Sequence, residues 1–159
     1  MNHLFSLSSD TIAVKDANDN KIIHFIDAQN GKLLNEANNS FKHKLDVIFI
    51  ALNYHGNSNE RICSFVDKNS DVYLTLVRSS HSSVFTRIKL TTLVRNLIWN
   101  DDANILVTIQ ETNKLNFWIY PFIAFVDRDI MSFAVIEKNL SENNKNLQLI
   151  NFSDNRLNI

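Results

Sequence analysis

The feature that most restricts the fold of this chain is a repeated pair of apolar runs joined by a polar tip. The pairs span residues 12–27, 61–77 and 104–120, and their tips are residues 16–20, 67–71 and 111–113. Each run is about six residues long, the usual length of a β-strand, so each pair predicts a hairpin. The first apolar residues after the tips, Ile22, Val72 and Leu115, are 50 and 43 residues apart.

Alternation of side chains within the runs predicts strands with two apolar faces. In residues 72–77, for example, Val72 and Leu74 alternate with Tyr73 and Thr75. Strands that are apolar on both faces are typical of sheets stacked against neighbours on each side. A unit of roughly 40–45 residues with four strands is the repeat of a WD-type propeller blade. We therefore predict an all-β fold: a partial WD40-type β-propeller of about three blades plus part of a fourth.

The predicted blades cover approximately residues 4–40, 41–90 and 91–130, with an incomplete blade at 131–159. Residues 46–52 and 93–99 are expected to be inner strands, and residues 85–90 an outer strand. Residues 137–146 are polar and are expected to form a loop with at most one helical turn. Residues 147–152 are expected to open another hairpin, with its return strand cut off at Ile159. No window of a dozen residues keeps a helical period, so helices are not expected.

Composition argues against several classes of chemistry. A net charge of −1 gives no general attraction to nucleic acids or anionic membranes, and two glycines are too few for a phosphate-binding loop. The five histidines lack metal-ligand spacing, and the only cysteine, Cys63, lies in an apolar run. We therefore expect a buried thiol, no metal and no cofactor. The longest apolar runs, such as residues 47–52, are too short to span a bilayer, and no secretory signal is recognisable.

Two groups of residues could carry catalysis. Asp127 and Asp129 flank Arg128 on a predicted strand, which places the two carboxylates on one face, roughly 7 Å apart. Paired carboxylates at such separations hydrolyse glycosides, so a propeller hydrolase is an alternative. A structural role for the two acids is favoured because the rest of such a site is missing. Residues 81–83 (His-Ser-Ser) are adjacent on a predicted loop and do not form a nucleophile relay. We predict that the chain is not an enzyme.

Four residues are candidates for fixing the blades. WD blades often place a histidine before the inner strand and an aspartate in the hairpin turn, where the two side chains hydrogen-bond. His43 precedes the strand 46–52 and Asp67 begins the second polar tip, so the pair has the expected order. Trp99, on an inner strand, and Trp118, near the usual blade-end tryptophan, are expected in the core. The residues of an interaction surface are unknown from the sequence.

Several motifs together resemble a known family. They are residues 6–14 (Ser-Leu-Ser-Ser-Asp-Thr-Ile-Ala-Val), 21–23 followed by Gly31-Lys32, 65–69 (Phe-Val-Asp-Lys-Asn), 98–101 (Ile-Trp-Asn-Asp), 118–121 (Trp-Ile-Tyr-Pro), 126–130 (Val-Asp-Arg-Asp-Ile) and 147–152. Their order and spacing cover nearly the whole chain, and residues 118–130 are the most specific part. The chain resembles the second propeller of the WD-repeat family of intraflagellar transport complex B.

The resemblance implies a non-enzymatic scaffold or adaptor that acts in cilium assembly by protein–protein binding. Its partners would be other subunits of intraflagellar transport complex B. Its location would be the cilium and the cytoplasm near the basal body. The resemblance implies no cofactor, no nucleic acid and no membrane insertion.

The chain also departs from the family pattern. It lacks a first propeller and a helical tail, and Met131 and Ser132 stand where the family tends to have Leu-Pro. We expect a fragment of a longer protein, with exposed apolar faces and sheet edges, so self-association is possible. Two alternatives stay open: a generic WD-repeat adaptor of another assembly, such as a vesicle coat, and a partial gene product without independent function.

Overall fold

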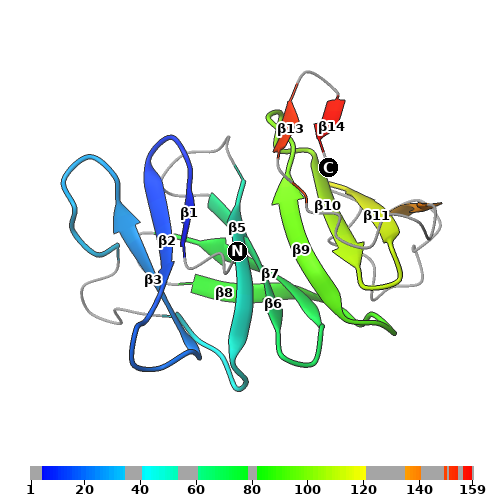
Figure 1. Ribbon diagram of the computed structural model, residues 1–159. Coiled ribbons are helices and arrows are strands. Elements are labelled where there is room, and N and C mark those ends of the chain that lie inside the picture. The colour runs from blue at the N-terminus through cyan, green and yellow to red at the C-terminus, as the bar shows by residue number, and fades with distance from the viewer. Residues whose placement is uncertain are drawn as a thin grey trace.

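The computed structural model describes residues 5–34, 41–53, 61–78, 82–120, 135–140, 149, 151–153 and 156–158 (Figure 1). All regular structure within these residues is β-strand. The first two sheets contain β1 (Phe5–Leu7), β2 (Thr11–Lys15), β3 (Ile22–Asp27), β4 (Phe41–Lys42), β5 (Val47–Leu52), β6 (Arg61–Asp67), β7 (Val72–Val77) and β8 (Ser82–Ile88). The remaining strands are β9 (Val94–Trp99), β10 (Ile105–Gln110), β11 (Lys114–Ile119), β12 (Val135–Asn139), β13 (Asn151–Ser153) and β14 (Arg156–Asn158).

Strands that follow one another in sequence pair antiparallel and build one sheet after another. The first sheet is β1-β2-β3-β4, the second is β5-β6-β7-β8, the third is β9-β10-β11-β12, and β13 pairs with β14. The strands β1, β5, β9 and β13 contact one another in succession and line a cavity of about 220 Å³ (Figure 1). The sheets are thus arranged like blades around an axis, and the predicted all-β, partial propeller fold is confirmed.

Apolar side chains fill the spaces between neighbouring sheets. We call the contact between the first and second sheets the first interface, and that between the second and third sheets the second interface. Phe25 and Phe65 belong to the cluster in the first interface, and Leu74 and Trp99 belong to the cluster in the second. The second sheet is therefore covered on both faces, and every residue of β6 is buried. This explains why its strands are apolar on both sides.

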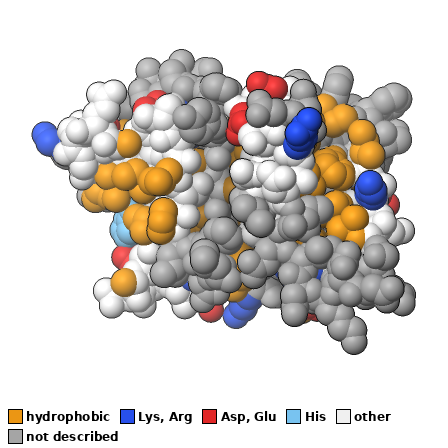
Figure 2. Space-filling view, turned by 45° about the horizontal axis from the view of Figure 1, so that its top comes forward, with side chains coloured by type: hydrophobic (Ala, Val, Ile, Leu, Met, Phe, Trp, Pro, Cys, Tyr) orange, Lys and Arg blue, Asp and Glu red, His pale blue; other side chains and the backbone are white. Residues whose placement is uncertain are grey.

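The first sheet has one covered face. Ala13 and Phe25 pack against the second sheet. Ile12 and Ile26 are cross-strand partners that alternate with Ala13 and Phe25, so they lie on the opposite face. Leu7 pairs with Ile12 and is 58% exposed. Hydrophobic side chains gather on this side of the molecule, at the left of Figure 2.

Polar residues form the tight turns in place of glycine. Asp16 directly follows the strand β2, and its Oδ1 accepts hydrogen bonds of 2.8 Å from the backbone N–H groups of Asn18 and Asp19. Ser70 and Asn113, in the next two hairpins, have φ angles of 63° and 58°. Short polar side chains adopt this left-handed backbone more readily than most residues. The chain can therefore make many turns with only two glycines.

The structure corrects the sequence-based prediction at three places. Residues 137–139 are not a loop but belong to β12, which pairs with β11 as the outer strand of the third sheet. This sheet extends past residue 130, where the third unit was expected to end. The hairpin at the C-terminal end is not cut off at Ile159, because β14 is its return strand. The outer strand β8 begins at Ser82, before the predicted start at Phe85.

Candidate functional site

The hairpin between β6 and β7 is organised around Asp67, the last residue of β6. Its Oδ1 accepts hydrogen bonds from the backbone N–H groups of Asn69 at 2.9 Å and Asp71 at 3.2 Å. Its Oδ2 lies 3.1 Å from Nε2 of His43, which precedes β5. The Asp67 side chain is completely buried, and that of His43 is nearly so. The structure therefore brings this sequence-predicted pair together, while its role in fixing the blade remains a prediction.

Aromatic rings surround His43. The ring centroids of Tyr73 and Phe65 lie 4.6 Å and 5.0 Å from the imidazole centroid, both in tilted, edge-on arrangements. Burial, followed by the negative charge of Asp67, raises the pKa of Tyr73 to about 12. Arg87 lies over the Tyr73 ring at 5.7 Å, and a hydrogen bond to Asp71 raises the pKa of Arg87. This packed cluster restrains the imidazole.

The first sheet has a counterpart of this pair that the sequence analysis missed. Nε2 of His24 lies 2.7 Å from Oδ2 of Asp16, and about a quarter of each side chain is exposed. The hydrogen bond from His24, with those from Asn18 and Asp19, lowers the pKa of Asp16 to about 2. The sequence signal was an aspartate at the start of each of the first two polar tips. The histidine partner was harder to find because it lies on the following strand rather than before the sheet.

The two tryptophans are buried in the second interface, as predicted from their apolar surroundings. The indole N–H of Trp99 donates to Ser64 Oγ at 3.0 Å, which joins the third sheet to the second. The indole N–H of Trp118 donates to Thr108 Oγ1 at 3.2 Å within the third sheet. Both indole nitrogens are satisfied by hydroxyl groups, which permits such large rings to be buried.

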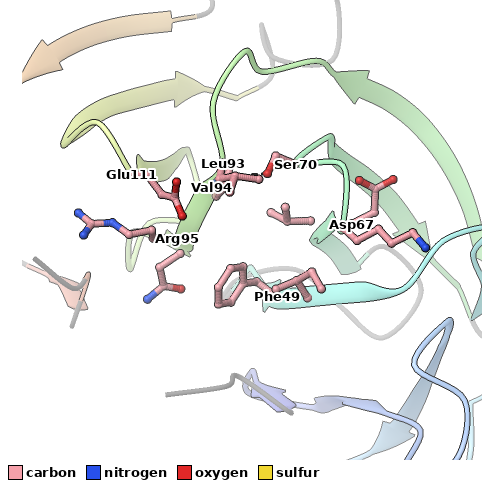
Figure 3. A pocket seen from close by; sticks show the side chains of 11 residues that line it. Phe49, Asp67, Ser70, Leu93, Val94, Arg95 and Glu111 are labelled. Carbon is pink, nitrogen blue, oxygen red and sulfur yellow. Dashed lines mark hydrogen bonds between the residues drawn. The ribbon is translucent and has the colours of Figure 1, made fainter. Parts of the chain in front are cut away.

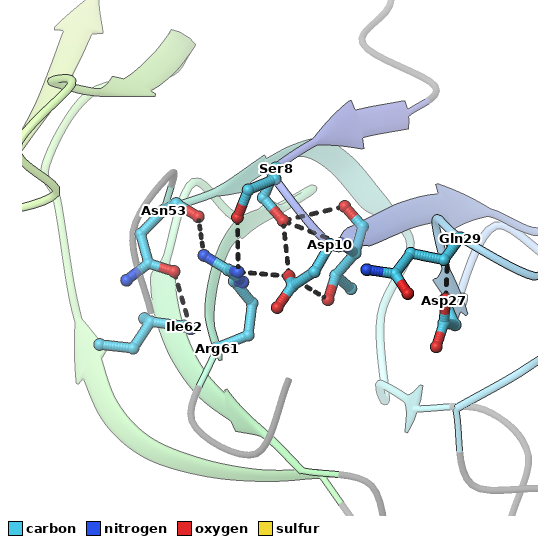
Figure 4. Close-up of polar contacts among 9 residues, drawn as sticks. Ser8, Asp10, Asp27, Gln29, Asn53, Arg61 and Ile62 are labelled. Carbon is cyan, nitrogen blue, oxygen red and sulfur yellow. Dashed lines mark hydrogen bonds and ion pairs between the residues drawn. The ribbon is translucent and has the colours of Figure 1, made fainter. Parts of the chain in front are cut away.

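A buried arginine connects the first two sheets (Figure 4). Arg61, at the start of β6, is fully buried and forms an ion pair with Asp10 in the turn between β1 and β2. The same guanidinium donates to the carbonyl oxygen of Asn53 at 3.0 Å and to Ser9 Oγ at 3.3 Å. The sequence analysis did not single out these residues. An arginine that begins a run predicted to be buried was the available signal, because a buried charge needs an acceptor.

The second interface contains an open cavity of about 510 Å³ (Figure 3). Its walls come from the start of β5, the turn between β6 and β7, the start of β9 and the turn between β10 and β11. The lining includes the apolar residues Phe49, Val66 and Val94 and the polar residues Lys68, Ser70, Arg95 and Glu111. The N–H group of Val94 donates to Ser70 Oγ at 3.1 Å across the interface. The cavity could not be predicted from the sequence, because its lining residues are far apart in the chain.

Most of the other candidate groups lie outside the described residues or on strands of the fold. Asp127, Asp129 and His81 lie outside the described residues, and Ser82 and Ser83 lie on β8. Cys63 is fully buried, and its burial raises the pKa of the thiol. Among the described residues, no cluster of three or more His, Cys, Asp or Glu side chains could hold a metal ion. The same part of the chain contains no helix of the length and apolarity that a membrane span requires.

Comparison with known proteins gives a consistent result along the whole chain. Residues 1–159 match the family model described as IFT80 second beta-propeller. The intraflagellar transport protein 80 homologs of Mus musculus and Rattus norvegicus are 41% and 39% identical to the chain over 154 residues. These matches cover 97% of the chain and 19% of each relative, so the chain spans about a fifth of their length.

Two solved structures share the fold. The crystal structure of Kluyvelomyces marxianus Hsv2 matches with a TM-score of 0.56 and 11% identity, over 72% of this chain and 34% of that one. A chain of the mitotic checkpoint complex matches with a TM-score of 0.54 and 22% identity, over 70% of this chain and 33% of that one. At these identities the likeness concerns the fold alone.

Proposed function

Because this chain belongs to the family of the IFT80 second β-propeller, we propose that it is a non-enzymatic scaffold or adaptor of intraflagellar transport. In this role it binds other proteins of complex B and contributes to cilium assembly. The observation that carries the proposal is the identity of 41% along 97% of the chain with a protein named for this transport. Its partners would be other complex B subunits, and its location the cilium and the cytoplasm around the basal body.

The geometry supports binding rather than chemistry. Polar groups such as the Asp67–His43 and Arg61–Asp10 pairs connect strands and sheets and are occupied with one another. We infer that His43, Asp67, Trp99 and Trp118 fix the packing of the sheets and do not contact a ligand. A rigid strand frame of this kind leaves the turns and rims free to vary and to bind partners. The exposed apolar side chains of Phe5 and Leu7 also support the proposed self-association.

The test is a replacement experiment in ciliated cells that lack the mouse relative. A chimera of that relative carries this chain in place of its own 154 matching residues. We expect the chimera to restore cilia and to co-purify with complex B subunits. A control chimera carries Trp118→Asp, which places a carboxylate at a fully buried position and should abolish both results.

Three outcomes would contradict the proposal. A stable chimera that neither restores cilia nor co-purifies with complex B subunits would remove the assignment to this transport system. Co-purification with vesicle-coat subunits instead would favour the alternative of a generic adaptor. If the chimera folds but co-purifies with no partner, the result would favour the alternative that the chain is a partial gene product without independent function.

A further inference from the structure

We propose that the cavity in the second interface binds an extended peptide segment of a partner protein, one that presents a bulky apolar side chain next to a carboxylate. This inference deepens the proposed function, on which it rests, by naming a surface and the chemistry of its ligand. The cavity of about 510 Å³ lies within the range of roughly 300–1,000 Å³ that is usual for binding pockets.

The cavity exists because one side chain differs between two equivalent positions. Asp16 and Asp67 have equivalent places in their hairpins, since each stands where a strand passes into the turn and its Oδ1 accepts a hydrogen bond from the backbone N–H group two residues later. Lys15 precedes Asp16, and its Nζ crosses the first interface to the carbonyl oxygen of Val47 at 3.3 Å. Val66 precedes Asp67 and lines the cavity in the second interface instead. A short apolar side chain thus leaves open the space that a lysine fills in the neighbouring interface.

The apolar part of the cavity continues onto the surface. Phe49, Val66 and Val94 line its inner part. Ile48 and Leu93 also line the cavity and are 37% and 51% exposed, so they extend its apolar lining to the surface. An apolar lining that spreads over the rim suits a chain that runs along the surface and inserts one side chain. An enclosed pocket would instead suit a small molecule.

The charged residues at the mouth of the cavity indicate which group the peptide should present next to its apolar side chain. The oxygens of the Asp67 carboxylate already accept hydrogen bonds from two backbone N–H groups and lie against His43, so they are not free to bind a peptide group. Figure 3 places Glu111 on the same wall as Arg95, opposite Asp67. Lys68 lies beside Asp67, is exposed, and forms no ion pair with any residue that the structure describes. A carboxylate on the bound peptide would complement Lys68.

The experiment measures binding of fluorescein-labelled peptides to the full chain by fluorescence anisotropy. Each short peptide consists of Gly and Ser, with Leu, Phe or Trp at its centre and Asp, Lys or Ser beside it. A peptide of Gly and Ser alone is the reference. We expect at least one Asp peptide to bind, its Lys counterpart to bind about tenfold more weakly, and the reference not to bind. If no peptide binds more tightly than the reference, the proposal is wrong.

Two variants locate the binding, each with a matched control. Lys68→Glu should lower the affinity for the Asp peptide about tenfold and raise the affinity for the Lys peptide. Lys44→Glu, at another exposed position, should change neither affinity. Leu93→Asp should weaken all bound peptides about tenfold, whereas Ile136→Asp, at an exposed position on β12, should not. All four positions are exposed, and circular dichroism verifies that each variant remains folded.

The outcomes separate this inference from the proposed function. Equal effects of Lys68→Glu and Lys44→Glu, or of Leu93→Asp and Ile136→Asp, would place the peptide elsewhere and overturn the inference. The measurement contains no ciliary component, so such a result leaves the chimera experiment unaffected. A chimera that fails in cells, combined with the expected peptide binding, would remove the transport function and retain the site.

Discussion

Apolar clusters fill both interfaces, but the polar contacts that link the sheets differ: charged side chains cross the first interface, whereas an indole and a hydroxyl group meet across the second. In the first interface, Arg61 pairs with Asp10, and Lys15 reaches the carbonyl oxygen of Val47. In the second interface, the corresponding link between sheets is the hydrogen bond from the Trp99 indole to Ser64, and an open cavity of about 510 Å³ remains. The two interfaces therefore differ in the polarity of the contacts that link their sheets.

The backbone explains why such different side chains are tolerated. The N–H group of Val47, at the start of β5, donates to the carbonyl oxygen of Asn20 in the preceding hairpin at 2.8 Å. The N–H group of Val94, at the start of β9, donates to Ser70 in its preceding hairpin. The same backbone position is thus held in both interfaces. Because the first residue of the inner strand donates to the preceding hairpin in both interfaces, the other side chains around this contact can differ, and the second interface retains an open cavity.

The largest effect is expected from Asp10→Ala in the first interface. The substitution leaves the fully buried Arg61 without its carboxylate, which should lower the free energy of unfolding by about 4 kcal/mol. Urea unfolding monitored by circular dichroism measures the change. The control Asp102→Ala removes an exposed carboxylate in a turn and should cost less than about 0.5 kcal/mol. Similar losses of unfolding free energy for both variants would mean that the Arg61–Asp10 ion pair does not stabilise the first interface.

A second substitution, Asp67→Ala, compares the two aspartate–histidine pairs. It removes the acceptor of His43 and of two backbone N–H groups in a buried turn, so we expect a loss of about 3 kcal/mol. Asp16→Ala removes equivalent contacts in a turn that water can reach, and its loss should be smaller. Thermal and urea unfolding of both variants provide the measurement. An equal or larger loss for Asp16→Ala would contradict the predicted role of the buried pair.

Trp99→Phe examines the polar contact of the second interface. The phenyl ring keeps most of the packing but cannot donate to Ser64, so a loss of about 1.5 kcal/mol is expected. A double-mutant cycle with Ser64→Ala should give a coupling energy of about 1 kcal/mol. Additive effects of the two substitutions would show that the hydrogen bond does not contribute to joining the sheets.

The smallest effect concerns pH. The pKa of Asp16 is lowered from 3.8 to about 2 in the folded chain by its hydrogen bonds with His24 and the turn. Its contribution to stability is complete above pH 3.8 and is lost as the pH falls toward about 2, because the unfolded chain takes up the proton first. Asp16→Asn should therefore make the decrease in stability over this range shallower. If the free energy of unfolding falls equally steeply with pH in the variant and the parent chain, Asp16 is not the group responsible.

The strands were largely predictable, because alternation and turn chemistry are local properties of the sequence. The three predicted hairpins correspond to β2–β3, β6–β7 and β10–β11. The strand β12 was missed because Glu137 and Lys138 make it polar, and an outer strand with exposed side chains carries no apolar pattern. Its partner strand β11 supplies the pairing, which the sequence of β12 alone cannot reveal.

The candidate sites were predictable only where a known arrangement links residues along the chain. The proximity of His43 and Asp67 followed from their order around a strand and a turn. The Arg61–Asp10 pair and the cavity next to Val66 depend on contacts between sheets. Such contacts join residues about 50 positions apart and follow from the angle and spacing of the sheets rather than from any local pattern.

The hydrogen bonds at Val47 and Val94 also give assembly a direction. Each inner strand begins on an acceptor supplied by the hairpin tip of the sheet before it. A completed sheet therefore provides a starting point for its successor. During synthesis the earlier sheet leaves the ribosome first. The sheets can then fold one after another from the N-terminus, and each new hairpin packs against a sheet that has already folded.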